Sequence, residues 1–277
     1  MTTIAITGAT GHVGGRAARI LGPQVTRLLV RDPDRAPRID GDPEVARVDY
    51  DDRDGALAAL AGIDVLLMVS GAESERRRAQ HRRFIRAAAD AGVRHVVYTS
   101  FDGAAPNAVF TLGRDHWDAE QAIRESGMAF TFLRDNFYSD FFPMFADEQG
   151  VIRGPAGDGA AAAVARADVG DVAAVVLAEA GAHEGAAYTL TGPEAITFAQ
   201  AAERMTAVLG RPFRYEEQTV AEAYASRRVF TDLEWQLDAW VSTYTAIAEG
   251  TLDAVSDHVE QLTGHPARTI EAALTGG

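Results

Sequence analysis

The sequence contains neither cysteine nor lysine among its 277 residues. The absence of cysteine excludes disulfides, thiolate nucleophiles and cysteine-ligated metals. Because all 26 basic residues are arginine, Schiff-base chemistry and a catalytic ammonium group are excluded as well. No apolar run reaches about 18 residues and no HExxH pattern occurs, which argues against a membrane partner and a metal site. With no basic segment ahead of an apolar stretch at its start, we expect a cytoplasmic protein.

Positive charge is also scarce. The 40 acidic residues outnumber the 26 basic ones and give a formal net charge of −14, so no nucleic-acid partner is expected. The arginines concentrate at positions 76–78, 82, 83 and 86. We interpret this cluster as a solvated helix face near Glu73 and Glu75, with a contact between subunits as the alternative. Monomer and homodimer therefore both remain open.

The first 135 residues alternate short β-rich runs with helical stretches, as in a parallel sheet with helical crossovers. The predicted strands lie at 3–7, 25–30, 45–49, 65–69, 95–99 and 129–134. Right-handed crossovers make this a Rossmann-type, doubly wound α/β fold. We place an NAD(P)-binding domain at 1–150 and a smaller, mainly helical substrate-binding portion at 151–277. In that second portion, the strand predicted near 187–190 is a candidate to rejoin the main sheet, and Thr197 is a candidate helix N-cap.

A glycine-rich turn directly follows the first predicted strand and opens a helix. Gly8 permits the tight turn, Gly11 lets the backbone approach a diphosphate, and Gly14 permits close packing of helix on strand. The amides at the helix N-terminus then face the anionic groups of a dinucleotide. The expected cofactor contacts in this turn are Gly8, Thr10, Gly11, His12, Val13 and Gly14.

The carboxyl ends of the following strands should line the same crevice. Arg31 ends the second strand and favours NADP, because a guanidinium can bind the 2′-phosphate; Asp32 keeps NAD as the alternative. Further cofactor contacts are expected from the ends of the third, fourth and fifth strands, at Asp49, Ser70, Gly71 and Thr99.

The G-x-x-G-x-x-G spacing of the turn resembles that of the short-chain dehydrogenase/reductase superfamily, most of whose members use a Tyr-x-x-x-Lys pair on the helix after strand five. This chain has no lysine, and its one tyrosine with an arginine four residues on, Tyr224 with Arg228, lies far along the chain from that helix. The corresponding helix instead carries His116-Trp117-Asp118-Ala119-Glu120, and Glu120 lies where it could orient His116 or pair with it. The absence of a tyrosine–lysine pair also disfavours a sugar-nucleotide epimerase, because extended epimerases generally keep that pair.

These stretches, together with Val30–Pro33 and Phe132–Tyr138, resemble the NmrA-like, atypical branch of the short-chain dehydrogenases. Within it, the sequence is most similar to NAD(P)H:quinone oxidoreductases and triphenylmethane-dye reductases. The resemblance implies an NADPH-dependent oxidoreductase that reduces a small planar acceptor such as a quinone. The alternative is a non-catalytic NAD(P)-binding redox sensor of the NmrA type. The candidate residues for orienting the acceptor are His116, Asn136, Tyr138 and Ser100, and for His116 a positioning role is favoured over general acid catalysis.

Overall fold

The computed structural model describes residues 2–276, which form two compact units built from alternating segments of the chain. Unit 1 comprises the residues up to Phe101, then Asp115–Arg134 and Ala167–Tyr188. Unit 2 comprises Asp102–Arg114, Asp135–Arg166 and the residues from Thr189 onward. The sequence analysis divided the chain once, near residue 150. In the structure the chain instead passes from one unit to the other several times.

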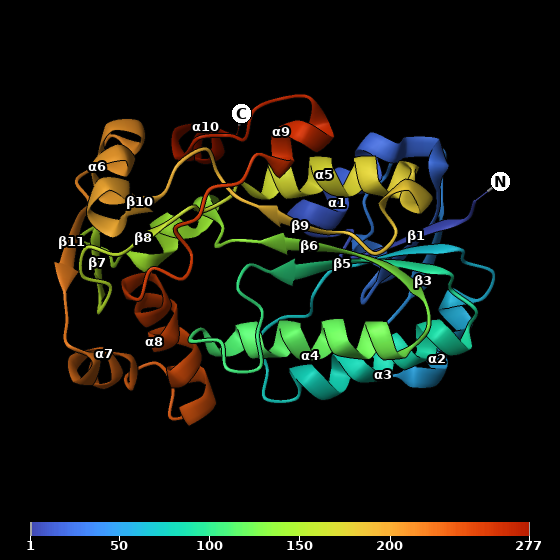
Figure 1. Cartoon of the computed structure of the whole chain (residues 1–277), viewed down its shortest axis with the longest axis horizontal. Coiled ribbons are helices and arrows are strands. Elements are labelled where there is room, and N and C mark those ends of the chain that lie inside the picture. Colours follow the sequence, from blue (N-terminus) through green and yellow to red (C-terminus); the bar gives the residue numbers. More distant parts are fainter. Residues whose placement is uncertain (1, 277) are drawn as a thin grey trace. The chain divides into compact units, whose positions relative to one another are not determined.

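Unit 1 is organised around a seven-stranded, mostly parallel sheet with the strand order β3-β2-β1-β4-β5-β6-β9 (Figure 1). The strands are β1 (Ile4–Thr7), β2 (Val25–Val30), β3 (Glu44–Arg47), β4 (Val65–Met68), β5 (His95–Phe101), β6 (Ala129–Asp135) and β9 (Ala187–Leu190). The central strand β1 pairs in parallel with both β2 and β4. The strand order reverses between β1 and β4, and at such a switch point doubly wound sheets bind ligands in a crevice outside the carboxyl ends of the strands.

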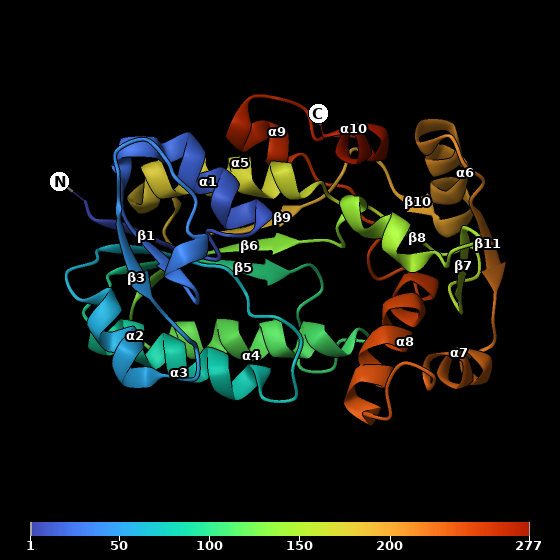
Figure 2. The same ribbon diagram turned by 180° about the vertical axis from the view of Figure 1, so that it is seen from behind.

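Helices cover both faces of this sheet, as Figures 1 and 2 show. One face carries α1 (His12–Leu21) and α5 (Arg166–Ala178); the other carries α2 (Arg53–Leu60), α3 (Arg77–Asp90) and α4 (Thr111–Glu125). A continuous apolar core fills the space on the second face, with Leu66, Phe84 and Phe132 fully buried. Burial on both faces explains why the strands read as nearly continuous apolar runs.

Unit 2 is mainly helical. It contains α6 (Phe198–Leu209), α7 (Val220–Arg227), α8 (Glu234–Ala248), α9 (His258–Thr263) and α10 (Ile270–Thr275). Its strands form two small pairs, β7 (Val151–Gly154) with β11 (Arg214–Glu217) and β8 (Ala160–Ala161) with β10 (Ile196–Thr197). Aromatic rings make its core: Phe198 stacks on Tyr244 with ring centroids 5.1 Å apart, and Phe145 meets both rings edge-on.

The predicted doubly wound fold is confirmed, and the strand near 187–190 joins the main sheet as β9. Thr197 caps α6 in a reciprocal capping box with Gln200. The sequence analysis did not predict α5 or α7. Among residues 2–276, none of the helices combines the length and the apolarity that a membrane crossing requires.

Candidate functional site

The glycine-rich turn of unit 1 has the backbone geometry that its sequence predicts. Gly8 follows β1 with φ +65°, in the left-handed region that favours glycine. The Gly11 amide donates a hydrogen bond of 2.9 Å to the Gly8 carbonyl, which closes the turn before α1 begins at His12.

Close approach of neighbouring atoms explains why glycine is required at positions 8 and 14 of this turn. A Cβ atom at Gly14 would lie 2.6 Å from the Thr7 carbonyl oxygen, and one at Gly8 would lie 2.9 Å from Cβ of Val69. Gly15, which the sequence analysis did not single out, is equally constrained, because its Cβ would lie 2.7 Å from the Ala9 carbonyl oxygen. The glycines therefore bring α1 directly against β1 and bring the turn against the end of β4.

The N-terminus of α1 is suited to an anion. Gly11 occupies the N-cap position without a side-chain cap, and the first turn contains no acidic residue. Thr10 and His12 are exposed beside it, whereas Val13 and Gly14 are buried. Uncapped first-turn amides and the positive end of the helix dipole favour bound phosphate.

Two charged residues, Arg31 and Asp32, follow directly after the end of β2. Arg31 is exposed, and it takes part in none of the ion pairs within residues 2–276. The Asp32 side chain accepts a hydrogen bond of 3.2 Å from the Asp34 amide and caps a short 3₁₀ turn, Pro33–Arg35. An anion that approaches this strand end therefore meets the Arg31 guanidinium, while one oxygen of the Asp32 carboxylate is bound to the Asp34 amide.

The residues after β4 form one wall of the crevice, and side chains from neighbouring strands hold them in place. Thr7 Oγ1 accepts from the Val69 amide at 2.8 Å, and Thr99 Oγ1 accepts from the Ser70 amide at 2.8 Å. The Tyr50 hydroxyl donates to the Val69 carbonyl at 2.7 Å. Asp49 lies exposed at the end of β3, where its carboxylate accepts from the Asp51 amide at 2.9 Å.

His116 on α4 lies buried in unit 1 with both ring nitrogens engaged. Its Nε2 lies 2.9 Å from Arg77 Nη2, and its Nδ1 lies 3.1 Å from the Tyr98 hydroxyl. Because a guanidinium only donates, Nε2 must be the accepting nitrogen and Nδ1 carries the proton. Burial and the nearby Arg77 charge lower the pKa of His116 well below its usual value, so the ring is neutral.

Glu120, one turn further along α4, forms neither a hydrogen bond nor an ion pair with His116. Its carboxylate accepts a hydrogen bond of 2.6 Å from Ser100 Oγ and forms a two-point ion pair with Arg134, at 2.8 and 2.6 Å. The expectation that Glu120 orients or pairs with His116 is therefore wrong. Ser100 is fully buried, and its hydroxyl is committed to this ion pair.

Asn136 and Tyr138 belong to unit 2, where each has partners of its own. Asn136 Nδ2 donates to the Leu252 carbonyl at 3.0 Å, and its Oδ1 accepts from the Phe137 amide at 2.8 Å. The Tyr138 hydroxyl donates to the Asp135 carboxylate at 2.5 Å. Burial, followed by the Asp135 charge, raises the pKa of Tyr138 well above its usual value.

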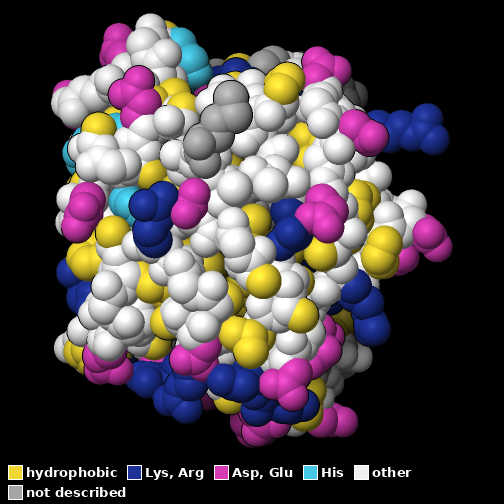
Figure 3. All heavy atoms as spheres, turned by 90° about the vertical axis from the view of Figure 1, so that its right-hand side faces the viewer, with side chains coloured by type: hydrophobic (Ala, Val, Ile, Leu, Met, Phe, Trp, Pro, Cys, Tyr) yellow, Lys and Arg dark blue, Asp and Glu magenta, His cyan; other side chains and the backbone are white. Residues whose placement is uncertain are grey.

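The arginine-rich face of α3 is largely a network of ion pairs. Arg82 binds Asp118 through two hydrogen bonds of 2.7 Å, and Arg78 pairs with Asp115 at 2.5 Å. Figure 3 shows basic and acidic side chains side by side along the lower edge of the molecule. The acidic partners thus belong to α4 and the β3–α2 loop, and they are Asp51, Asp115, Asp118 and Glu125 in place of Glu73 and Glu75. The interpretation as a solvated face is wrong for one member, Arg77, which is 4% exposed.

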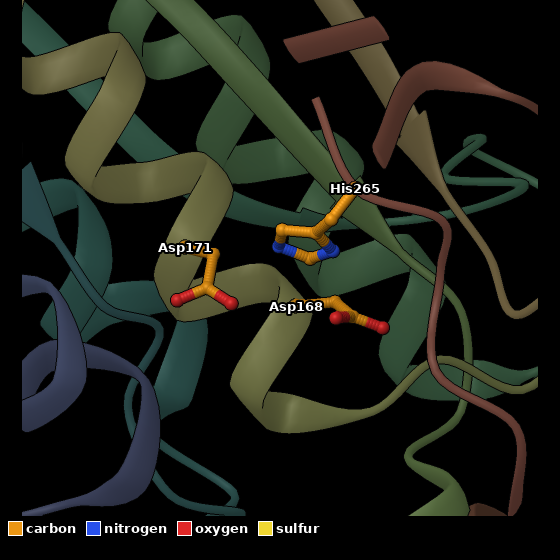
Figure 4. A group of neighbouring side chains, drawn as sticks. All are labelled: Asp168, Asp171 and His265. Carbon is orange, nitrogen blue, oxygen red and sulfur yellow. The ribbon is translucent and has the colours of Figure 1, made fainter. Parts of the chain in front are cut away.

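An ion pair joins α1 to α5 on the other face of the sheet. Arg16 binds Asp171 through hydrogen bonds of 2.5 and 3.0 Å. Figure 4 shows Asp168 and Asp171 on successive turns of α5. Gly170 lets α5 approach closely, because a Cβ there would lie 2.9 Å from Cβ of Arg16. The ion pair therefore fixes α1, the helix that follows the glycine turn, against α5.

Comparison with known proteins gives consistent matches. The model of a family described as NAD(P)H-binding matches residues 8–180. Quinone oxidoreductase 2 of Escherichia coli (strain K12) is 33% identical over 98% of this chain and 97% of that protein. The structure of the NADPH-dependent quinone oxidoreductase from E. coli, complexed with NADPH, superimposes with a TM-score of 0.88 and 34% identity over 99% of each chain. The triphenylmethane reductase of Citrobacter sp., complexed with NADP(H), superimposes with a TM-score of 0.85 and 30% identity over 99% of each chain.

Proposed function

The chain belongs to the NAD(P)H-binding family, and on that premise we propose that it is an NADPH-dependent oxidoreductase that reduces a small planar acceptor such as a quinone. The observation that carries the proposal is the glycine turn at the switch point of the sheet, with an uncapped helix N-terminus behind it. The names of the relatives, which denote reductases of quinones and of triphenylmethane dyes, support this class of acceptor.

The end of β2 supports NADPH rather than NADH. Arg31 is exposed and suited to a 2′-phosphate, since a guanidinium binds phosphate through two parallel hydrogen bonds. To favour NADH, Asp32 would have to accept from a 2′-hydroxyl, and one of its two carboxylate oxygens already caps the following 3₁₀ turn.

The protein's own contribution to the reaction is binding and orientation. When bound, NADPH supplies a hydride, and a quinone that takes up this hydride and one proton becomes a hydroquinone. The uncapped amides of α1 hold the diphosphate, and the wall at Val69–Gly71 limits where the rest of the dinucleotide can lie. Fixing donor and acceptor at reacting distance is the main rate effect that such a site can supply.

The proton comes from water in this proposal. His116 has its Nε2 lone pair occupied by Arg77 and its Nδ1 directed at Tyr98, so neither nitrogen is free to exchange a proton with a ligand. The Tyr138 hydroxyl is bound to Asp135 and its pKa is raised. The roles proposed for His116, Asn136, Tyr138 and Ser100 are therefore those of positioning residues, each within its own unit, and not of proton donors.

The test is to measure NADPH oxidation with a panel of quinones and dyes, and to titrate NADPH, NADP⁺ and NADH by calorimetry. We expect turnover with at least one quinone and tighter binding of NADPH than of NADH. Different affinities for the oxidised and reduced cofactor without any turnover would favour the redox sensor instead. Failure to bind any of the three dinucleotides would refute both the oxidoreductase and the redox sensor.

A further inference from the structure

Gly71, the last residue of the wall that follows β4, is held at both of its peptide groups by α3. Its amide donates a hydrogen bond of 2.9 Å to His81 Nε2, and its carbonyl accepts one of 2.9 Å from Arg77 Nε. Both side chains are buried, with exposures of 0% for His81 and 4% for Arg77. Together with the Val69 and Ser70 contacts, side chains thus fix each of the three residues of the wall.

The chemistry of His81 suits this task. The backbone N–H of Gly71 can only donate, so His81 Nε2 must be the accepting nitrogen. The ring proton of the neutral imidazole therefore lies on Nδ1. That Nδ1 is buried without a hydrogen-bond partner in the structure of residues 2–276. A buried donor left unpaired is costly, so the hydrogen bond that Nε2 accepts from Gly71 is the polar contact that this ring makes among the described residues. It also limits residue 71, because a Cβ there would lie 3.2 Å from His81 Nε2.

Arg77 extends the same clamp to α4. While Nε binds the Gly71 carbonyl, Nη2 donates to His116 Nε2 at 2.9 Å, and Nη1 lies 3.6 Å from an Asp115 oxygen. One planar guanidinium therefore ties the wall to two residues of α4. Lysine ends in one ammonium nitrogen and lacks the rigid planar fork through which Arg77 holds Gly71 and His116 from two separate nitrogens.

We infer that Arg77 and His81 are positioning residues for the dinucleotide, which act by fixing the backbone of Ser70–Gly71 at the switch point of the sheet. The inference rests on the proposed use of this crevice by NADPH. Neither side chain needs to touch the cofactor. Their loss should release the wall and weaken cofactor binding, although α3 itself stays in place through its apolar stripe at Phe84, Ile85 and Ala88.

The test compares His81→Leu, His81→Gln and Arg77→Lys with the control Ile85→Ala, which opens a cavity one turn further along the same helix at a side chain that makes no hydrogen bond to Gly71. The measurements are NADPH affinity by calorimetry, KM and kcat with a quinone, and hydrogen exchange of the Gly71 amide. We expect His81→Leu and Arg77→Lys to raise Kd and KM for NADPH on the order of tenfold to a hundredfold, with a much smaller change in kcat and faster Gly71 exchange. His81→Gln, which keeps an acceptor, should recover most of the affinity.

The control separates positioning from stability. Ile85→Ala should lower the melting temperature but leave the NADPH affinity and Gly71 exchange unchanged. Unchanged affinity and exchange in folded His81→Leu and Arg77→Lys would overturn the inference, as would an equal loss of affinity in Ile85→Ala. If His81→Leu does not fold, Arg77→Lys and His81→Gln decide the question. Wild-type protein that binds no NADPH would instead refute the proposed function, so the two failures are distinguishable.

Discussion

Replacing Gly14 by alanine tests whether the close approach of α1 to β1 matters for cofactor binding. The added Cβ would lie 2.6 Å from the Thr7 carbonyl oxygen and 2.7 Å from two backbone atoms of Gly8. Ordinary van der Waals separation begins at 3.4 Å, so α1 has to move about 0.8 Å, the difference between 3.4 and 2.6 Å. Both neighbours are backbone, and no side chain can rotate away to relieve the contact.

Two effects of this substitution oppose each other. Alanine normally favours a helix interior over glycine by roughly 0.5–1 kcal/mol, whereas overpacking costs about 1–3 kcal/mol. We expect a net loss of stability of about 1–2 kcal/mol. The shift displaces the amides that face the diphosphate by nearly an ångström, so Kd for NADPH should rise on the order of tenfold to a hundredfold.

Gly92 provides a matched control within unit 1. It has φ +85° with nothing within 4 Å of its would-be Cβ, so Gly92→Ala costs about 1 kcal/mol through its backbone conformation alone. It precedes β5, at the opposite end of the sheet from the crevice. Chemical denaturation and calorimetry should show comparable destabilisation of the two variants but weakened NADPH binding only in Gly14→Ala. Wild-type affinity in Gly14→Ala would refute the argument from close packing.

Three further substitutions or conditions test other parts of unit 1. Arg31→Gln should lower the preference for NADPH over NADH on the order of tenfold or more, as read from the ratio of kcat/KM values; an unchanged ratio would assign the 2′-phosphate to other residues. Glu120→Ala should lower the free energy of unfolding by about 2–3 kcal/mol, because it leaves Arg134 without its buried partner; a loss below about 0.5 kcal/mol, the size of an ordinary surface substitution, would contradict the ion-pair argument. Burial lowers the pKa of His81 to about 3 and that of His116 well below 6.5, so unfolding takes up protons and stability should fall as the pH drops from about 6.5 toward 3. His81→Gln should flatten this acid limb in denaturation curves, and an identical limb in both proteins would contradict the assignment of a neutral His81.

The parts of the fold that the sequence predicted are those where local backbone requirements leave few choices of residue. The spacing of Gly8, Gly11 and Gly14 after an apolar strand predicted both the turn and the close packing, and Thr197 predicted the start of α6. In contrast, α5 is buried around most of its circumference. A helix of that kind has no polar face and no strong period of 3.6 residues, so its pattern of valine and alanine did not distinguish it from a strand or a loop.

The partners of the candidate polar residues could not be predicted, because they lie far away along the chain. Asn136 binds the carbonyl of Leu252, 116 residues away, and Glu120 chooses Ser100 and Arg134 over the nearby His116. Arg77 sat among five other arginines and was interpreted with them. A helical-wheel reading would have separated it, since Arg77 and His81 continue the apolar stripe of Phe84 and Ala88, whereas its neighbours do not.

The alternating segments of the two units have a consequence for how the protein can be cut, recombined or synthesised. The chain passes from one unit to the other five times, at the junctions between the six segments. No single proteolytic cut releases either unit intact, and a chimera that exchanges one unit between homologues needs five crossover points. During translation β9 is the last strand of the sheet to emerge, so the edge of β6 stays open until residue 190 has left the ribosome. A fragment that ends at residue 150 would keep that edge exposed, and we expect it to aggregate.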